Sequence, residues 1–115
     1  MNKTDARFEL FQSSNKTAWF FRLKANEWQM ILHSEGYTTK AACLNGVESV
    51  RKNSQREGAY DKKESTNGKY YFNLLAANHQ SIGRSQLYES KQGLKNCIVS
   101  VKKNAPVAEI IDLTE

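Results

Sequence analysis

Apolar and polar positions along the first half of the chain follow two spacings in turn. Between residues 19 and 24 every second side chain is apolar and lies on one side, which is typical of a strand with one buried face. Short apolar runs at residues 8–11 and 30–33, bounded by turn-forming residues, predict strands before and after it. The period then changes to that of a helix face, which comprises Cys43, Gly46, Val47 and Val50. The first half therefore predicts three strands followed by a helix.

The same pattern returns 51 residues further along the chain. Residues 21–54 align with residues 72–105 without a gap, and 13 of the 34 pairs are identical, far more than composition alone would give. The second helix face consists of Leu94, Cys97, Ile98 and Val101. After each helix a further stretch, at residues 59–64 and 109–113, predicts one more strand. The chain therefore contains one supersecondary unit used twice.

The duplication predicts the fold class. One unit of about 50 residues would have a marginal core, whereas two units that share a sheet can bury both helices. We therefore expect an α+β fold, with tandem β3-α-β repeats sharing one mainly antiparallel sheet and two helices on one face. The chain is interpreted as a single domain over residues 1–115, with repeat one at about 6–56 and repeat two at about 57–113.

The helix ends carry recognisable capping residues. Thr38 or Thr39 in the first copy and Ser90 in the second are predicted N-caps, because their hydroxyls can accept from free backbone N–H groups. Asn53 and Asn104 are predicted to adopt the left-handed conformation that often closes a helix.

Composition and charge narrow the classes of function. The chain has 115 residues, 39% of them hydrophobic and 25% charged, and no apolar run approaches the roughly 20 residues of a membrane span. Its net charge of +5 attracts polyanions, so nucleic acid or an acidic partner is one interpretation, and plain solubility is the other. The N-terminal residues lack a signal-peptide apolar region, and the two cysteines form no CxxC, which together indicate the cytoplasm.

Candidate catalytic chemistry is sparse. Cys43 and Cys97 both lie on the predicted helix faces and are interpreted as buried free thiols. His33 and His79 have no second ligand at metal-binding spacing, and no phosphate-binding loop or nucleophile motif is present. We therefore expect a protein that is not an enzyme, with no metal and no cofactor.

Six residues are the candidates for a binding site. Phe20, Arg22 and Lys24 share the outer face of one strand, and Tyr71 and Asn73 share the outer face of its counterpart. Aromatic rings beside cations on an open sheet suit single-stranded nucleic acid, where bases stack and cations meet phosphates. The same residues would equally suit a protein contact or self-association. The sixth candidate, Trp28, lies at a predicted hairpin tip and could anchor a partner.

Four segments of the chain resemble the YegP-like family of small bacterial proteins of unknown function. They are residues 71–80 (YFNLLAANHQ), 34–37 (SEGY), 49–53 (SVRKN) and 100–104 (SVKKN). The resemblance covers roughly residues 6–112 and implies two β3-α-β motifs in one sheet with exchanged C-terminal strands. It also implies that a two-repeat chain is a monomeric pseudo-dimer, because single-repeat members are similar to dimers of the same shape. The sequence departs from the family pattern at the turn Asn26-Glu27-Trp28 and at Cys97, where the family often has glycine.

The resemblance brings no accepted site residues, so function is inferred from the residues alone. The sequence favours a non-catalytic binding or protein-interaction module of the bacterial cytoplasm, with no membrane partner. The alternative is a protein that binds single-stranded RNA or DNA through the open aromatic and basic face of the sheet.

Overall fold

The computed structural model of the chain describes residues 6–26 and 29–114. Its elements, in chain order, are β1 (Arg7–Gln12), β2 (Trp19–Asn26), β3 (Gln29–His33), α1 (Lys40–Asn53), the 3-10 turn η1 (Glu57–Ala59), β4 (Tyr60–Glu64), β5 (Tyr70–Leu75), β6 (Ser81–Arg84), α2 (Lys91–Asn104) and β7 (Glu109–Asp112). We call β1–β3 with α1 half one, and β4–β6 with α2 half two.

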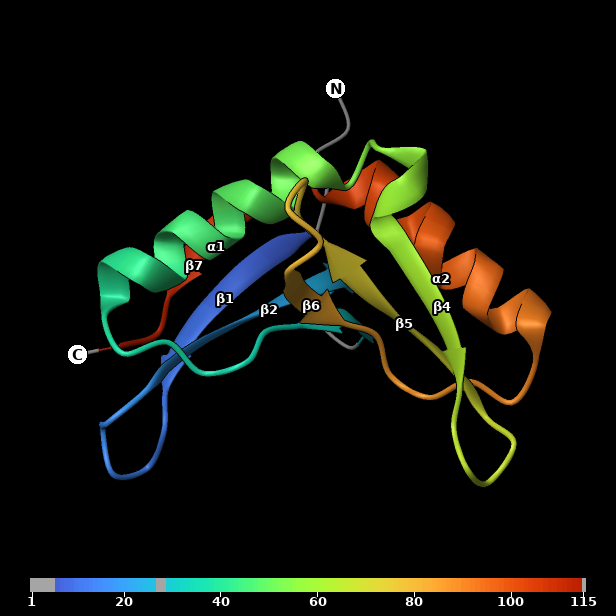
Figure 1. The fold of residues 1–115 in the computed structure, drawn as a ribbon. Coiled ribbons are helices and arrows are strands. Elements are labelled where there is room, and N and C mark those ends of the chain that lie inside the picture. Colours follow the sequence, from blue (N-terminus) through green and yellow to red (C-terminus); the bar gives the residue numbers. More distant parts are fainter. Residues whose placement is uncertain (1–5, 27–28, 115) are drawn as a thin grey trace.

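The described strands form one seven-stranded sheet in the order β4-β5-β6-β3-β2-β1-β7. All neighbouring strands are antiparallel except β1 and β7, which are parallel. Both helices lie on the same face of the sheet, which is bent into an arch (Figure 1). The structure therefore confirms the α+β class, the mainly antiparallel sheet and the placement of the helices.

The two halves meet at the centre of the sheet. β3 pairs with β6 through His33 and Arg84, which are equivalent positions of the two repeats. In each half, a serine that follows the third strand ties it back to the second strand. Ser34 Oγ accepts from the Phe21 N–H at 2.9 Å, and Ser85 Oγ accepts from the Phe72 N–H at 3.0 Å. The sequence repeat is therefore also a repeat of hydrogen bonds.

The helix N-termini are capped as the sequence predicts. Thr39 Oγ1 accepts from the Ala42 N–H, and Ser90 Oγ accepts from the Gly93 N–H, both at 3.0 Å.

The prediction for the C-termini is wrong. Asn53 and Asn104 lie within the helices, and their side-chain amides donate to the carbonyls of Ser49 at 2.8 Å and Ser100 at 2.9 Å. Because these amides satisfy carbonyls near the helix end, the backbone does not need a left-handed residue there. The residues that follow each helix, Ser54 and Ala105, remain right-handed.

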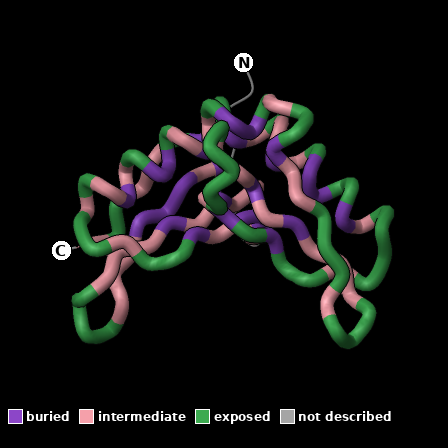
Figure 2. Tube along the Cα trace, viewed as in Figure 1, coloured by how far each residue is buried: buried purple, intermediate pink, exposed green. Residues whose placement is uncertain are grey.

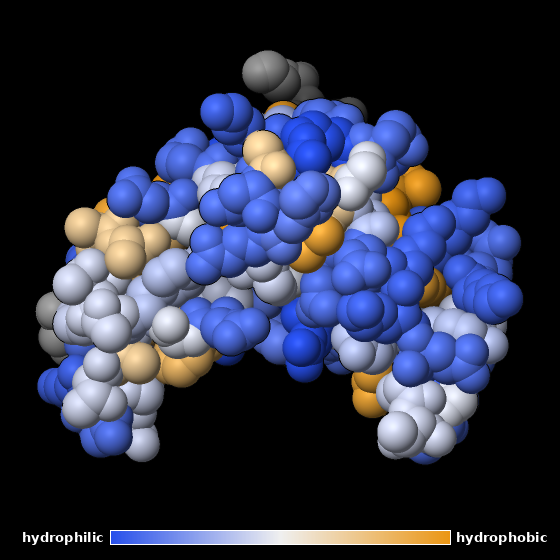
Figure 3. Space-filling model, in the orientation of Figure 1, coloured by the Kyte–Doolittle hydropathy of each residue, from blue (hydrophilic) through white to orange (hydrophobic). Residues whose placement is uncertain are grey.

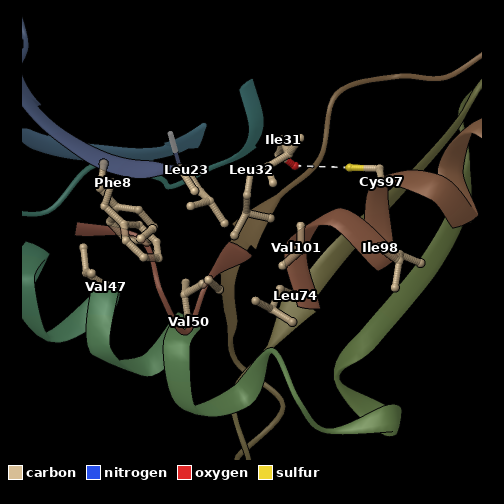
Figure 4. Close-up of a cluster of buried hydrophobic side chains, with 14 of the residues drawn as sticks. Phe8, Leu23, Ile31, Leu32, Val47, Val50, Leu74, Cys97, Ile98 and Val101 are labelled. Carbon is tan, nitrogen blue, oxygen red and sulfur yellow. Dashed lines mark hydrogen bonds between the residues drawn. The ribbon is translucent and has the colours of Figure 1, made fainter. Parts of the chain in front are cut away.

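The core lies between the helices and the sheet. Buried residues run through the strands and along the helix sides that face them (Figure 2). α1 contacts β2, β5 and β6, while α2 contacts β2, β3 and β5, so each helix packs on both halves. Figure 4 shows this shared core, with the Cys97 thiol of half two donating to the carbonyl of Ile31 in half one at 3.4 Å. Neither half therefore completes its core alone. No described helix is long and apolar enough to cross a membrane.

The strands that follow the two helices both cross to the other half, as the resemblance implies. β7 leaves α2 and lies outside β1, where the Leu113 N–H donates to the Leu10 carbonyl at 2.8 Å. β4 leaves α1 through η1 and becomes the first strand of half two, antiparallel to β5. The exchange is therefore unequal, because β7 covers the outer edge of β1 while β4 itself forms the opposite edge of the sheet.

Candidate functional site: the concave face of the sheet

The face of the sheet that the helices leave uncovered is the candidate site. It forms the underside of the arch, and the hairpin loops at residues 13–18 and 65–69 extend below it at the two ends (Figure 1). The space-filling view shows the hollow between these two ends (Figure 3). We call this surface the concave face.

A row of polar residues crosses the concave face. Its members are cross-strand neighbours in register, and in spatial order they are Glu9, Arg22, His33, Arg84, Asn73 and Asp61. They lie opposite the core because side chains alternate along a strand, and Phe21 and Leu23 beside Arg22 are fully buried. We call this set the polar row. It has acidic residues at its ends and basic residues toward its middle.

In half one the carboxylate of the polar row is paired with basic neighbours. Glu9 is only 7% exposed and accepts a hydrogen bond from Arg22 Nε at 2.7 Å. Its other carboxylate oxygen lies 3.7 Å from Lys24 Nζ and 4.0 Å from Arg7 Nη1. A nearly buried carboxylate surrounded by three basic groups is paired as buried charges must be. Arg22 and Lys24 are therefore already engaged before any ligand arrives.

In half two the side chains of the polar row make fewer contacts with one another, and those contacts are more exposed. Arg84 Nε donates to Asn73 Oδ1 at 3.0 Å, and the guanidinium carbon of Arg84 lies 5.4 Å from the centroid of the Tyr71 ring. Asp61 pairs with Lys63 at 3.3 Å, and both side chains are more than a third exposed. The exposed Arg84 and the partly exposed Asp61–Lys63 pair can exchange partners at little cost.

Aromatic rings flank the polar row toward the hairpin loops. Phe20 stacks on Phe11 with ring centroids 5.4 Å apart and 16° between the planes. The guanidinium carbon of Arg22 lies 4.6 Å from the centroid of Phe11. Tyr71 takes the equivalent place in half two. Such rings offer apolar contact area beside fixed charges, as binding surfaces often do.

A small pocket lies in the middle of the concave face region. It has a volume of about 240 Å³ and is lined by His33, Glu35, Ser81, Gly83 and Arg84. Gly83 also contacts the buried Leu32, and a Cβ atom built on Gly83 would lie 2.8 Å from a Leu32 methyl carbon. The pocket is too small for a drug-sized ligand and can hold only a side chain or a small polar group.

The structure brings the predicted residues together in two groups. Phe20, Arg22 and Lys24 lie on the concave face of half one, and Tyr71 and Asn73 lie on that of half two. Trp28 lies outside the described residues.

Sequence reasoning missed several members of the site, namely Glu9, Phe11, His33, Arg84 and Asp61. Side chains alternate along residues 8–11, so Glu9 and Phe11 lie on the other face of the strand from the buried Phe8 and Leu10. This alternation could have placed both residues on the uncovered face. The pairing of β1 with β2, which makes Glu9 the partner of Arg22, could not be read from either strand alone.

Both cysteines are free and buried, as the sequence predicts. Burial raises the pKa of the Cys43 thiol to about 11, and it also raises the pKa of the Cys97 thiol. A thiol with a raised pKa is a poor nucleophile near neutral pH. Within residues 6–26 and 29–114, no group of three or more His, Cys, Asp or Glu side chains could hold a metal ion.

Comparison with known proteins gives consistent matches over most of the chain. A family described as a domain of unknown function (DUF1508) matches residues 14–61 and again residues 65–112. The chain is 48% identical over 107 residues to the UPF0339 protein YegP of Escherichia coli K12, covering 93% of this chain and 96% of that protein. It is also 48% identical over 107 residues to a UPF0339 protein from the ptx operon 5' region of Stutzerimonas stutzeri, covering 92% and 95% of the two chains.

Two solved structures have the same fold. The solution NMR structure of E. coli yegP, a protein of unknown function, matches with a TM-score of 0.91 and 45% identity, covering 99% of this chain and 97% of that chain. The solution NMR structure of a UPF0339 protein from Shewanella oneidensis matches with a TM-score of 0.89 and 47% identity, covering 96% and 92%.

Proposed function

Because the chain belongs to the DUF1508 family, with two copies of the domain in tandem, we propose that it is a non-catalytic protein-interaction module of the bacterial cytoplasm whose binding surface is the concave face. The observation that carries this proposal is the polar row, which crosses the uncovered face with charges of both signs in register.

A row of mixed charge suits another protein surface. Opposite charges placed in register on a partner would fix its orientation and reject partners of the wrong pattern. Phe20 in half one and Tyr71 in half two flank the polar row and provide aromatic anchors of the kind that dominate binding energy.

The polar row is less suited to nucleic acid, which is the second candidate. In its favour, guanidinium groups lie close to Phe11 and Tyr71, and rings beside cations can receive stacked bases and phosphates. Against it, Glu9 engages Arg22 and Lys24, and a second carboxylate, Asp61, closes the other end of the row. Fewer cations of the row are therefore free to contact phosphates.

The test is site-specific crosslinking in cells. A photoreactive phenylalanine analogue is placed at Phe20 or Tyr71, and as a control at Val99, which is 56% exposed on α2 away from the sheet. We expect a discrete protein adduct from the first two positions and not from Val99, and we expect it to disappear in Arg22→Glu, Arg84→Glu double variants. The adduct is identified by mass spectrometry and its binding is repeated with purified proteins. Adducts that are equal at Val99 would contradict the proposal.

A parallel titration separates the second candidate. Labelled single-stranded RNA and DNA are added at low and near-physiological salt, and fluorescence anisotropy is recorded. Micromolar binding that weakens with salt and is lost in Phe20→Ala, Tyr71→Ala would establish the nucleic-acid function instead.

A further inference from the structure

The two outer edges of the sheet are built alike but are covered differently. In half one, β7 lies along β1 and closes its edge. In half two, β4 occupies the place of β1, and no described strand lies beyond it. Figure 1 shows β4 at one end of the arch and β7 at the other.

The backbone of β4 offers free hydrogen-bonding groups on its outer side. The N–H and the carbonyl of Phe72 both bond to Ser85, at 3.0 Å each, and so point away from β4. The Lys62–Phe72 pair is therefore a non-hydrogen-bonded pair, and the N–H and carbonyl of Lys62 point outward. Half one has the same arrangement. Phe21 is bonded to Ser34, so the backbone N–H and carbonyl of its strand partner Leu10 point toward the outer edge. There, the outward carbonyl of Leu10 accepts from the Leu113 N–H beyond the end of β7.

The side chains around the two edges are also equivalent. The Arg51 guanidinium carbon lies 5.4 Å from the centroid of the Phe8 ring, and the Lys102 ammonium lies 5.6 Å from that of Tyr60. Lys40 begins α1 and bonds to Asp112 of β7, and Lys91 begins α2 at the equivalent position. Lys91 instead rests 5.9 Å from the centroid of the Tyr70 ring.

A groove lies where a strand like β7 would fit in half two. Its volume is about 460 Å³, and it runs between β4 and the start of α2, lined by Lys62, Lys63, Glu64, Tyr70, Lys91, Leu94 and Lys95. Four of these seven residues are lysines, and Tyr70 and Leu94 provide apolar surface. Within the described residues, Lys62, Lys91 and Lys95 have no carboxylate at ion-pair distance. The groove therefore combines an open strand edge with unpaired positive charge.

β7 shows what such an edge binds. It runs parallel to its neighbour, with Ile110 beside Phe8 and Asp112 beside Leu10. Ile110 packs against the core, and Asp112 meets the lysine that begins the helix. The registers of Phe8 and Leu10 correspond to those of Tyr60 and Lys62 in half two, because Phe21 and Phe72 are equivalent.

We propose that the groove between β4 and α2 binds an extended acidic segment of a partner protein, which adds to the sheet as a strand parallel to β4. An aliphatic side chain of the segment lies at the register of Tyr60, and a carboxylate two residues later reaches Lys91. Backbone hydrogen bonds to Lys62 provide affinity, and the lysines select an acidic sequence. This site is separate from the concave face and goes beyond the function proposed for that face.

Lysines on an edge strand have another known effect, which is to keep sheet edges from pairing at all. The two interpretations differ in a measurable way. A guarded edge rejects every strand, whereas the proposed groove accepts an acidic strand and rejects a basic one.

The experiment uses the whole chain and a fluorescent peptide with the sequence of residues 107–114 (VAEIIDLT) as the probe. We expect saturable binding by anisotropy, with NMR shift changes at the amides of Lys62 and Glu64. Lys91→Glu should weaken binding about tenfold, as loss of one charge-assisted contact does, and should reverse the preference in favour of a peptide carrying Asp112→Lys. Lys103→Glu makes the same charge change at the far end of α2 and should leave affinity unchanged.

Three results would overturn the proposal. One is no binding at millimolar peptide, which would leave the lysines as guards of the edge. Another is binding that Lys91→Glu and Lys103→Glu change equally, which would indicate unspecific attraction to a basic protein. The third is shift changes confined to β1, which would mean that the peptide displaces β7. The concave-face variant Phe20→Ala, Tyr71→Ala should bind the peptide normally, so failure here and failure of the proposed function are distinguishable.

Discussion

At Gly46 of α1, the neighbouring side chains leave no room for a Cβ atom. A Cβ built on Gly46 would lie 2.9 Å from Cε2 of the buried Phe21 ring and closer still to the Tyr37 hydroxyl. Tyr37 in turn stacks on Phe21 with ring centroids 6.2 Å apart. Gly93, in the other helix, has only ordinary contacts around its Cβ position, the nearest being Ser90 Oγ at 3.4 Å.

We expect Gly46→Ala and Gly93→Ala to have opposite effects on stability. Gly93→Ala should raise the free energy of unfolding by about 0.5–1 kcal/mol, because alanine favours the helix. Gly46→Ala gains the same preference but must displace two rings, and should lower the free energy of unfolding by roughly 1–2 kcal/mol net. Urea denaturation measures both, and a Gly46→Ala variant as stable as Gly93→Ala would show that the Tyr37 ring moves freely.

Individual residues were predicted well where a local rule fixes them. Thr39 and Ser90 cap their helices because free N–H groups at a helix start require an acceptor. Asn53 and Asn104 were not, because an asparagine near a helix end can satisfy a carbonyl with its side chain as readily as it can adopt a left-handed backbone.

At the scale of elements, β7 depends on a small number of anchoring contacts. Arg51 Nη2 donates to the carbonyl of Ala108 at 2.6 Å just before the strand, and Lys40 bonds to Asp112 at its end. The Lys40 hydrogen bond, helped by hydrogen bonds from Thr114, lowers the pKa of Asp112 from 3.8 to about 2. The folded state therefore gains stability from this carboxylate above pH 3.8 and loses it as the pH falls toward about 2.

We expect Lys40→Ala to raise the pKa of Asp112 toward 3.8, because the largest cause of its lowering is removed. An NMR titration of the Asp112 carboxyl carbon measures this directly. Lys63→Ala, which removes the Lys63–Asp61 pair at the other edge of the sheet, is the matched control and should leave Asp112 unchanged. An unaltered pKa in Lys40→Ala would mean that Thr114 alone holds the carboxylate.

The elements themselves follow from periodicity, but their neighbours do not. Alternation in residues 19–24 and the helix face through Val47 and Val50 predict β2 and α1 from local spacing. The pairing of β7 with β1 joins opposite ends of the chain, and nothing in the spacing of residues 109–113 specifies that partner. The polar row was missed for the same reason, since Glu9 and Asp61 acquire their neighbours only when strands pair.

At the scale of the whole molecule, the shared core couples the two halves. Leu23 and Leu74 are equivalent residues of the two repeats, and both are fully buried. Because each helix packs on strands of both halves, we propose that the chain unfolds as one unit.

We expect Leu23→Ala and Leu74→Ala each to lower the free energy of unfolding by about 2–5 kcal/mol in a single transition. Both tryptophans, Trp19 and Trp28, lie in the first half of the sequence, so tryptophan fluorescence reports on half one. Its midpoint should nevertheless shift in Leu74→Ala, which alters half two. A fluorescence midpoint that stays in place while circular dichroism shifts would show that the halves unfold separately.

The position of β7 also has a consequence for synthesis of the chain. β1 leaves the ribosome early, whereas the strand that covers its edge emerges only after both helices have been made. Until then the nascent chain exposes two bare strand edges, one on β1 and one on β4, and partly made sheets of this kind are prone to join one another. On this topology, translation is the period of greatest risk of aggregation, and arrival of β7 halves the number of exposed edges.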